Sequence, residues 1–101
     1  MLITRWQAPQ VPSLDQLKLI LHSEGAELKE EEFPANSEVK EHRHPFEEIR
    51  IIYSGSMIFN FTGNKILLRP GDKIVIPPNT KHSMHINGDE PCHSVVAYRP
   101  F

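Results

Sequence analysis

The residues best suited to chemistry lie close together between positions 42 and 48. His42 and His44 are two residues apart, so on a β-strand their side chains point to the same face. Two imidazoles at that spacing can hold one metal ion, and Glu48 can add a carboxylate to them. His82 follows a turn-forming segment much later in the chain and is the candidate for a further ligand. We therefore predict a metal site built from these side chains; the alternative is a set of ordinary surface or half-buried polar residues.

The combination of imidazole and carboxylate limits the choice of metal. This donor set suits iron, manganese, nickel, copper or zinc, whereas a structural zinc site mostly uses thiolates. Cys92 is the only cysteine, so the chain cannot build a thiolate site by itself. The expected cofactor is one divalent transition metal, whose identity the residues leave open.

Arg50 is the candidate catalytic residue beside this site. In a strand it shares a face with Glu48, so it would point toward the ion. There it would bind an anionic or enediolate oxygen of a substrate and would hold Glu48 in orientation. The alternative is a structural ion pair with a carboxylate. Met84 and Ile86 share the face of His82 and would form an apolar wall of the pocket.

Short β segments separated by turn signals must position these residues. The expected strands are 26–33, 39–44, 47–53, 57–61, 65–68, 73–76, 82–86 and 92–98. Pro70-Gly71 and Asn87-Gly88 are typical of the turns between them. Eight short strands at nearly regular spacing indicate an all-β sandwich or barrel.

A helix is expected before the strands. Ser13 and Gln16 form a capping box, and Gly25 is suited to end the helix. Apolar residues at a spacing of three or four line one helical face: Leu14, Leu17, Ile20 and Leu21. We predict an extended arm over 1–12, a helix over 13–24 and a barrel over 26–99. A strand is the rival interpretation of the helix, because leucines also alternate between 17 and 21.

Length and composition limit the chain to one small domain over residues 1–101. With 101 residues, of which 39% are hydrophobic, it can build a single core. A net charge of -2 with mixed signs argues against nucleic acid as a partner, and no run approaches the roughly 18 apolar residues of a membrane span. A single cysteine excludes an intrachain disulfide, and the first ten residues do not resemble a secretory signal. We expect a cytoplasmic protein that binds a small molecule and neither nucleic acid nor a membrane.

The other polar residues carry no predicted role. His85 faces away from His82 if the strand alternates, and His93 lies in the last strand with uncertain phase. The acidic run 30–32 is interpreted as a solvated strand without a partner.

The stretch that begins at His42 resembles the cupin superfamily, in its small single-domain cupin 2-like form. The family's first motif has two histidines separated by one residue, a glutamate four residues later and a glycine seven residues further on. His42, His44, Glu48 and Gly55 match this spacing. The glycine that opens the motif is replaced by Asn36, which tolerates a positive φ and can still turn the chain.

The second motif of the cupins is matched by Gly71, Pro77 and His82. Its later glycine is replaced by Asn79, and Ile86 stands where the family has asparagine. Neither departure removes a ligand. The resemblance implies a jelly-roll β-barrel that holds one metal ion through three histidines and one glutamate.

The segment 47–50, with Gly55 and 59–61, is similar to the acireductone dioxygenase branch of the cupins. That branch implies cleavage of an enediol by dioxygen at iron or nickel. Those enzymes are much longer, however, and a helix followed directly by a minimal barrel is similar to small cupins of unassigned function. The leading hypothesis is a metal-dependent, dioxygenase-like enzyme for a small oxygen-rich or anionic molecule. The alternatives are a non-catalytic cupin that senses or stores a metal or small ligand, and a sugar isomerase-type cupin.

The other face of the strand that carries Glu48 bears Glu47, Ile49, Ile51 and Tyr53. Three of these four side chains are large and apolar, so this stripe requires a cover. Cupins commonly pack barrel against barrel, and we predict a homodimer that buries the stripe. The alternative is that the amino-terminal helix covers the stripe within one chain.

Overall fold

The structure is a computed structural model, and it describes residues 2–22 and 27–99. The elements, in chain order, are β1 (Leu2–Thr4), α1 (Leu14–His22), β2 (Glu27–Phe33), β3 (Glu38–His42), β4 (Glu47–Ser54), β5 (Met57–Phe61), β6 (Asn64–Leu68), β7 (Lys73–Ile76), β8 (His82–Ile86) and β9 (Cys92–Arg99).

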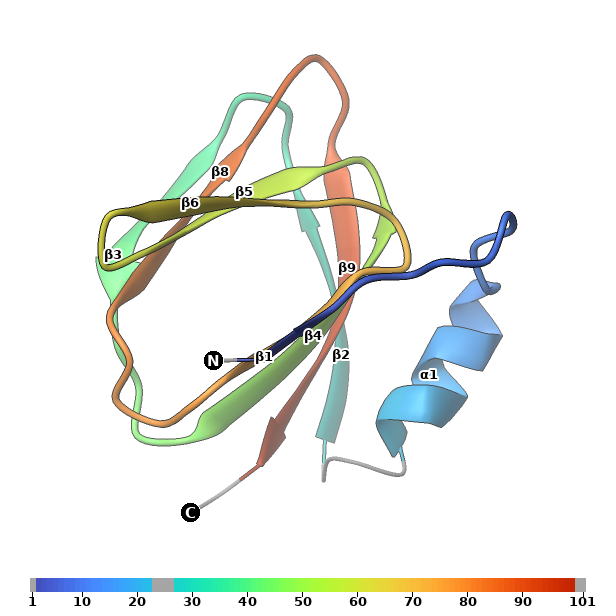
Figure 1. Cartoon of the computed structure of the whole chain (residues 1–101), viewed down its shortest axis with the longest axis horizontal. Helices are drawn as coiled ribbons and strands as arrows, with labels where there is room; N and C mark the ends of the chain where they lie inside the picture. Colours follow the sequence, from blue (N-terminus) through green and yellow to red (C-terminus); the bar gives the residue numbers. More distant parts are fainter. Residues whose placement is uncertain (1, 23–26, 100–101) are drawn as a thin grey trace.

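The strands form two antiparallel sheets that face each other and enclose a barrel (Figure 1). One sheet has the order β1-β7-β4-β9-β2 and the other has the order β3-β8-β5-β6. Neighbours such as β2 and β9 are distant in the sequence, as in a jelly roll. The predicted all-β barrel with a short helix before it is confirmed.

A hydrophobic cluster fills the space between the sheets. Its buried members are Ile52, Met57, Phe59, Leu68, Ile74, Ile76, Met84, Ile86 and Cys92. In β8 the burial alternates from His82 through Met84 to Ile86, so one strand supplies both a polar residue of the candidate site and two core residues. The site is therefore held by the same packing that stabilises the barrel.

Helix α1 lies on the outer face of the five-stranded sheet (Figure 1). Ser13 caps its first turn: the Ser13 Oγ accepts from the Gln16 backbone N–H at 3.2 Å, and the Gln16 Oε1 accepts from the Ser13 N–H at 2.8 Å. The predicted capping box is confirmed, whereas the predicted end of the helix near Gly25 lies outside the described residues. Within the described part of the chain, no helix is long and apolar enough to cross a bilayer.

The apolar stripe on the outer face of β4 does not remain exposed. Leu17 and Leu21 of α1 pack on Ile49 and Ile51, which are 0% and 2% exposed. The helix therefore covers the stripe within one chain, as in the alternative interpretation. The stripe is therefore not available as the dimer interface that the sequence suggests, and the homodimer stays a prediction.

The amino-terminal arm is partly a strand. Leu2–Thr4 form β1, which pairs antiparallel with β7 of the same chain and is the edge strand of the five-stranded sheet. Behind β1, the Asp72 carboxylate accepts from Arg5 Nη1 at 2.7 Å and from the Trp6 backbone N–H at 3.0 Å. Trp6 is thereby fixed beside Gly71, where an added Cβ would lie 2.5 Å from the tryptophan side chain. The arm is thus anchored at Trp6, through contacts of its backbone with Asp72 as well as through its ring.

The two asparagines that replace motif glycines adopt the left-handed conformation. The φ angle is 58° at Asn36 and 59° at Asn79. Asparagine tolerates this region better than other non-glycine residues, so both turns form without glycine.

Candidate metal centre

Three histidines meet in the wall of the barrel. His42 ends β3, His82 begins β8, and their ring centroids lie 4.3 Å apart. The ring of His44 lies 5.9 Å from that of His42 and 5.3 Å from that of His82. One ligand atom from each of the three lies within 4.8 Å of the others, so the structure brings these predicted ligands together.

His44 reaches this cluster from a loop and not from a strand. The predicted strand 39–44 ends two residues early, because β3 stops at His42 after a shift in its register with β8. The His44 carbonyl instead accepts from the Asn79 N–H at 2.7 Å, which ties the loop to the turn before His82. The side chain still joins its neighbours, but strand alternation is not the reason.

Each of the three rings is oriented by a backbone carbonyl two residues away in the sequence. The distances from Nδ1 to that oxygen are 2.8 Å for His42, 2.9 Å for His44 and 2.8 Å for His82. A carbonyl oxygen only accepts, so Nδ1 carries a proton, and in the neutral form of each ring Nε2 has the lone pair that a metal requires. This pattern of hydrogen bonds is the one that orients histidines as metal ligands through Nε2.

His82 provides the clearest fit to a metal ion. Its Nε2 is buried and, among the described residues, has no hydrogen-bond partner. A buried nitrogen without a partner is unfavourable, and a cation would satisfy it. Burial also lowers the pKa of His82, which favours the neutral ring that a metal requires. Phe59 stacks on the ring with a centroid distance of 5.3 Å and helps to fix its plane.

Glu48 approaches the cluster from β4, in the other sheet. It is 2% exposed, and its Oε1 lies 3.0 Å from the Nε2 of His44. Burial by itself would raise the pKa of Glu48, but the neighbouring Arg50, aided by His82 and His44, lowers the pKa below its usual range. The carboxyl group is therefore charged. The three histidines form the compact group, and Glu48 joins it through His44.

These side chains fit a divalent transition metal. The three clustered imidazoles, of which His82 has a buried Nε2 without a hydrogen-bond partner among the described residues, and a charged carboxylate form a mixed nitrogen and oxygen donor set. Such a set suits iron, manganese, nickel, copper and zinc alike.

Arg50 lies behind Glu48 and is 2% exposed. Its Nε donates to Glu48 Oε2 at 3.0 Å, its Nη1 to Ser94 Oγ at 2.7 Å and its Nη2 to Glu31 Oε1 at 2.8 Å. The guanidinium carbon Cζ lies 5.5 Å from the centroid of the Phe33 ring. Three nitrogens of the side chain are thus bound to protein groups.

Glu31 and Ser94 are residues of the site that the sequence interpretation misses. The acidic run 30–32 has partners after all: Glu31 binds Arg50, and Glu30 pairs with Lys18 at 2.8 Å. Alternation along β2 places Glu31 on the opposite face from Glu30 and Glu32. That Glu31 meets Arg50 depends on the pairing of β2 with β9 and of β9 with β4. No local pattern contains that information.

An aromatic wall flanks His44. Phe46 stacks on the imidazole with a centroid distance of 4.3 Å, and Tyr98 meets both rings edge-on. The Nζ of the exposed Lys29 lies 5.6 Å from the centroid of the Tyr98 ring. These residues place a phenol and an ammonium group near the ligands.

The other sulfur- and nitrogen-bearing candidates do not join the centre. Cys92 is in the core, where burial raises the pKa of its thiol to about 11, so it is not a nucleophile. His93 lies near Glu30 on the outer face, with an Nε2 to Oε1 distance of 3.4 Å. His85 alternates with the buried His82 and Met84 along β8 and is half-buried on the other face.

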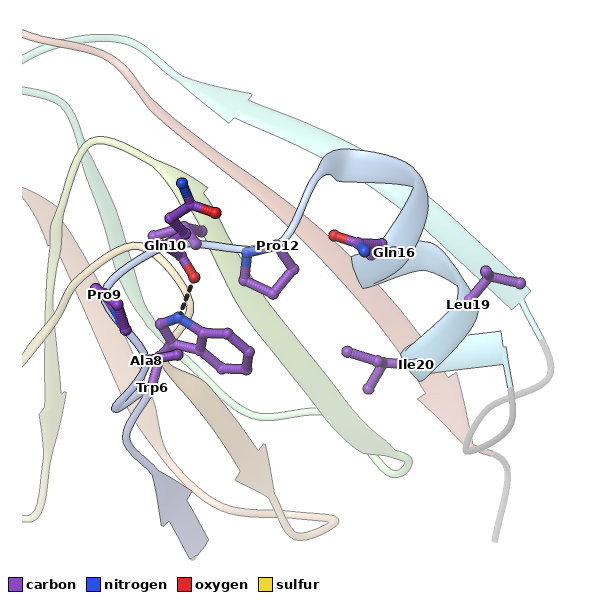
Figure 2. A pocket seen from close by; sticks show the side chains of 9 residues that line it. Trp6, Ala8, Pro9, Gln10, Pro12, Gln16, Leu19 and Ile20 are labelled. Atoms are coloured by element: carbon purple, nitrogen blue, oxygen red, sulfur yellow. Dashed lines mark hydrogen bonds between the residues drawn. The ribbon is translucent and has the colours of Figure 1, made fainter.

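An open groove of about 630 Å³ lies away from the histidines, between the arm and α1. Figure 2 shows Trp6 and Pro12 on one side of it and Leu19 and Ile20 on the other, with Trp6 Nε1 donating to the Gln10 carbonyl at 2.7 Å. It contains no side chain of the metal centre.

Comparisons with known proteins find similar sequences among the acireductone dioxygenases. The acireductone dioxygenase of Bacillus licheniformis is 40% identical over 67 residues, which is 61% of this chain and 36% of that protein. That of Bacillus anthracis is 39% identical over 67 residues, again 61% of this chain and 38% of that protein. The chain thus matches little more than a third of the length of these curated relatives.

Solved structures of similar shape include a predicted oxalate decarboxylase from Thermotoga maritima, with a TM-score of 0.69 and 21% identity over 83% of this chain and 74% of that one. The DMSP lyase DddQ of Ruegeria pomeroyi has a TM-score of 0.65 and 30% identity over 71% of this chain and 36% of that one. Residues 29–98, well over half of the sequence, match the Cupin_2 family model, which describes the cupin domain. The chain therefore belongs to the cupin domain family.

Proposed function

We propose that this protein is a metal-dependent cupin enzyme that carries out a dioxygenase-type reaction on a small oxygen-rich or anionic molecule. One observation carries the proposal: backbone carbonyls hold the three imidazoles through Nδ1, and one ligand nitrogen of each ring lies within 4.8 Å of the others, beside a charged, buried carboxylate. The local similarity to acireductone dioxygenases supports the reaction class. Because the match is limited to about a third of those enzymes, the reaction and its substrate are proposals.

His42, His44, His82 and Glu48 would hold one divalent transition metal, which supplies Lewis acidity and open coordination positions for substrate and dioxygen. Arg50 keeps Glu48 charged and oriented through its hydrogen bond to Oε2. The rings of Phe46 and Tyr98 shield one side of His44 from water. Lys29, over Tyr98, supplies the exposed positive charge that an anionic substrate would meet.

A second candidate is a metal- or ligand-binding cupin without turnover. It is favoured by Arg50, which is buried and whose three nitrogens each donate to a protein group. An enzyme needs groups that act on the substrate, and a binding module does not.

Metal analysis of the purified protein, with matched variants, tests the proposal. We expect roughly one equivalent of metal per chain, lost in His82→Ala and retained in His85→Ala, which removes an imidazole from the other face of the same strand. An oxygen electrode then measures consumption by the iron-loaded protein over a panel of enediols. Metal content unchanged in His82→Ala contradicts the ligand set. Metal binding without oxygen consumption favours the binding module.

A further inference from the structure

Glu31 is the outer end of a chain of charged groups that leads from the protein surface to the metal centre. Arg50 connects it to Glu48: Nη2 donates to Glu31 Oε1 at 2.8 Å, and Nε donates to Glu48 Oε2 at 3.0 Å. The third acceptor, Ser94, is fully buried. Three strands thus converge on one guanidinium: β2 through Glu31, β4 through Glu48 and β9 through Ser94.

The exposure of these groups falls from one end of the chain to the other. The side chain of Glu31 is 34% exposed, whereas those of Arg50 and Glu48 are 3% and 2% exposed. Arg50 therefore cannot satisfy its charge with water, and Glu31 is the group that the solvent reaches. The ion pair between Arg50 and Glu48 therefore depends on whether Glu31 also binds Arg50.

We infer that Glu31 is a positioning residue for the candidate metal centre: it holds Arg50 so that Glu48 keeps its place as a ligand. The inference rests on the proposed metal site. Two carboxylates share one guanidinium, so Glu31 takes part of the positive charge that would otherwise fall on Glu48 alone. It also fixes Nη2, so the guanidinium plane is held at two points and Nε remains directed at Oε2.

Loss of Glu31 weakens metal binding for two physical reasons. Arg50 then directs its whole charge at Glu48, which draws electron density from the carboxylate and makes it a poorer donor. The surroundings of the ion also lose one negative charge. Both effects act in the same direction.

Glu32→Gln is a matched control for Glu31→Gln. It removes the same charge from the next residue of β2, whose side chain is exposed and alternates to the outer face. Isothermal titration with Co²⁺ gives the affinity of each variant, and the visible spectrum of the Co²⁺ form reports the ligand geometry. We expect about a tenfold weaker affinity and a shifted absorption band for Glu31→Gln, at the lower end of the effect of outer-shell partners. Glu32→Gln should match the wild type, because an exposed, screened charge has little effect.

Two further variants test whether Glu31 acts through Arg50. Glu31→Asp shortens the side chain and should give an intermediate affinity. Glu31→Gln added to Arg50→Gln should weaken binding by less than the sum of the two single losses, because only the direct charge effect of Glu31 remains once Arg50 is replaced.

Equal affinities and spectra for Glu31→Gln and Glu32→Gln would overturn the inference while leaving the metal site intact. Additive losses in the double variant would overturn it as well. A wild-type protein that binds no Co²⁺ would overturn the proposed function and this inference with it.

Discussion

His44 Nε2 lies 3.0 Å from Glu48 Oε1, and in a neutral His44 ring, whose proton lies on Nδ1 toward the Phe46 carbonyl, both of these atoms would be acceptors. Two acceptors at that distance repel each other unless a proton or a metal cation lies between them. The contact joins a loop of one sheet to a strand of the other. It makes Glu48 the residue whose charge decides whether a cation is held there.

Glu48→Gln should abolish most of the metal affinity. The amide loses the negative charge and donates weakly to a metal, so we expect a loss larger than the roughly 10- to 100-fold effect of an outer-shell change. The metal-free variant should also be less stable by about 2–4 kcal/mol, somewhat less than for a buried ion pair that is broken outright, because Arg50 loses Glu48 but keeps Glu31. Titration calorimetry and urea unfolding measure the two effects. Glu47→Gln, on the other face of β4, is the control, and an equal affinity in both variants would remove Glu48 from the ligand set.

Gly71→Ala should dislodge the amino-terminal arm. Its φ is +90°, and an added Cβ would lie 2.5 Å from the side chain of Trp6. Gly63→Ala separates backbone strain from the clash with Trp6, because Gly63 also has a positive φ, of +81°, but has no atom within 4 Å of an added Cβ. Both variants should lose about 1 kcal/mol from backbone strain. Trp6 is the only tryptophan, so a red-shifted emission in Gly71→Ala alone reports the displaced arm. The same emission in both variants would mean that the ring does not pack on this turn.

The Asp72 carboxylate should stabilise the protein only above acidic pH. Burial would raise its pKa, but hydrogen bonds from the backbone of Arg69 and Trp6 and from Arg5 outweigh burial and lower the pKa. A lowered pKa in the folded state gives stability that is complete well above the ordinary value of 3.8 and is lost as the pH falls below it. Asp72→Asn should therefore lower the free energy of unfolding by about 1–3 kcal/mol at pH 7. In urea unfolding the gap from the wild type should narrow at pH 3. An equal difference in the free energy of unfolding at pH 7 and pH 3 would show that the charge of Asp72 does not contribute to stability.

Leu21→Ala should destabilise the protein far more than Leu19→Ala. Leu21 is fully buried on β4 and β9, whereas Leu19 is 70% exposed on the same helix. We expect a loss of about 2–5 kcal/mol for Leu21→Ala and a change within about 0.5 kcal/mol for Leu19→Ala. Urea unfolding followed by circular dichroism compares them. Similar losses in the two variants would contradict the packing of α1 on the sheet.

The sequence predicts most of the metal centre because the relation among its residues is local. His42, His44 and Glu48 are within seven positions of each other, and one strand end and one turn suffice to bring them together. The pairing of Glu31 with Arg50 is different. It requires β2 to pair with β9 and β9 with β4, and the residues of 27–33 do not specify either choice.

The cover of the β4 stripe shows the same limit. An apolar face indicates that something must bury Ile49 and Ile51, but it does not distinguish a helix of the same chain from a second barrel. The choice depends on where α1 packs in the folded chain, which no local pattern specifies. Strand β1 is missed for a related reason: three residues before a proline-containing segment have no periodicity, and only the edge of β7 makes them a strand.

The candidate ligands come from both sheets, with His42 and His82 on β3 and β8 and Glu48 on β4. A bound ion would therefore act as a cross-link between the two halves of the barrel. The sheets must close before the ligands meet, so the ion would form its bonds late and slow unfolding more than it speeds folding. The ion would therefore lower the unfolding rate of the barrel, and a chelator would raise that rate again.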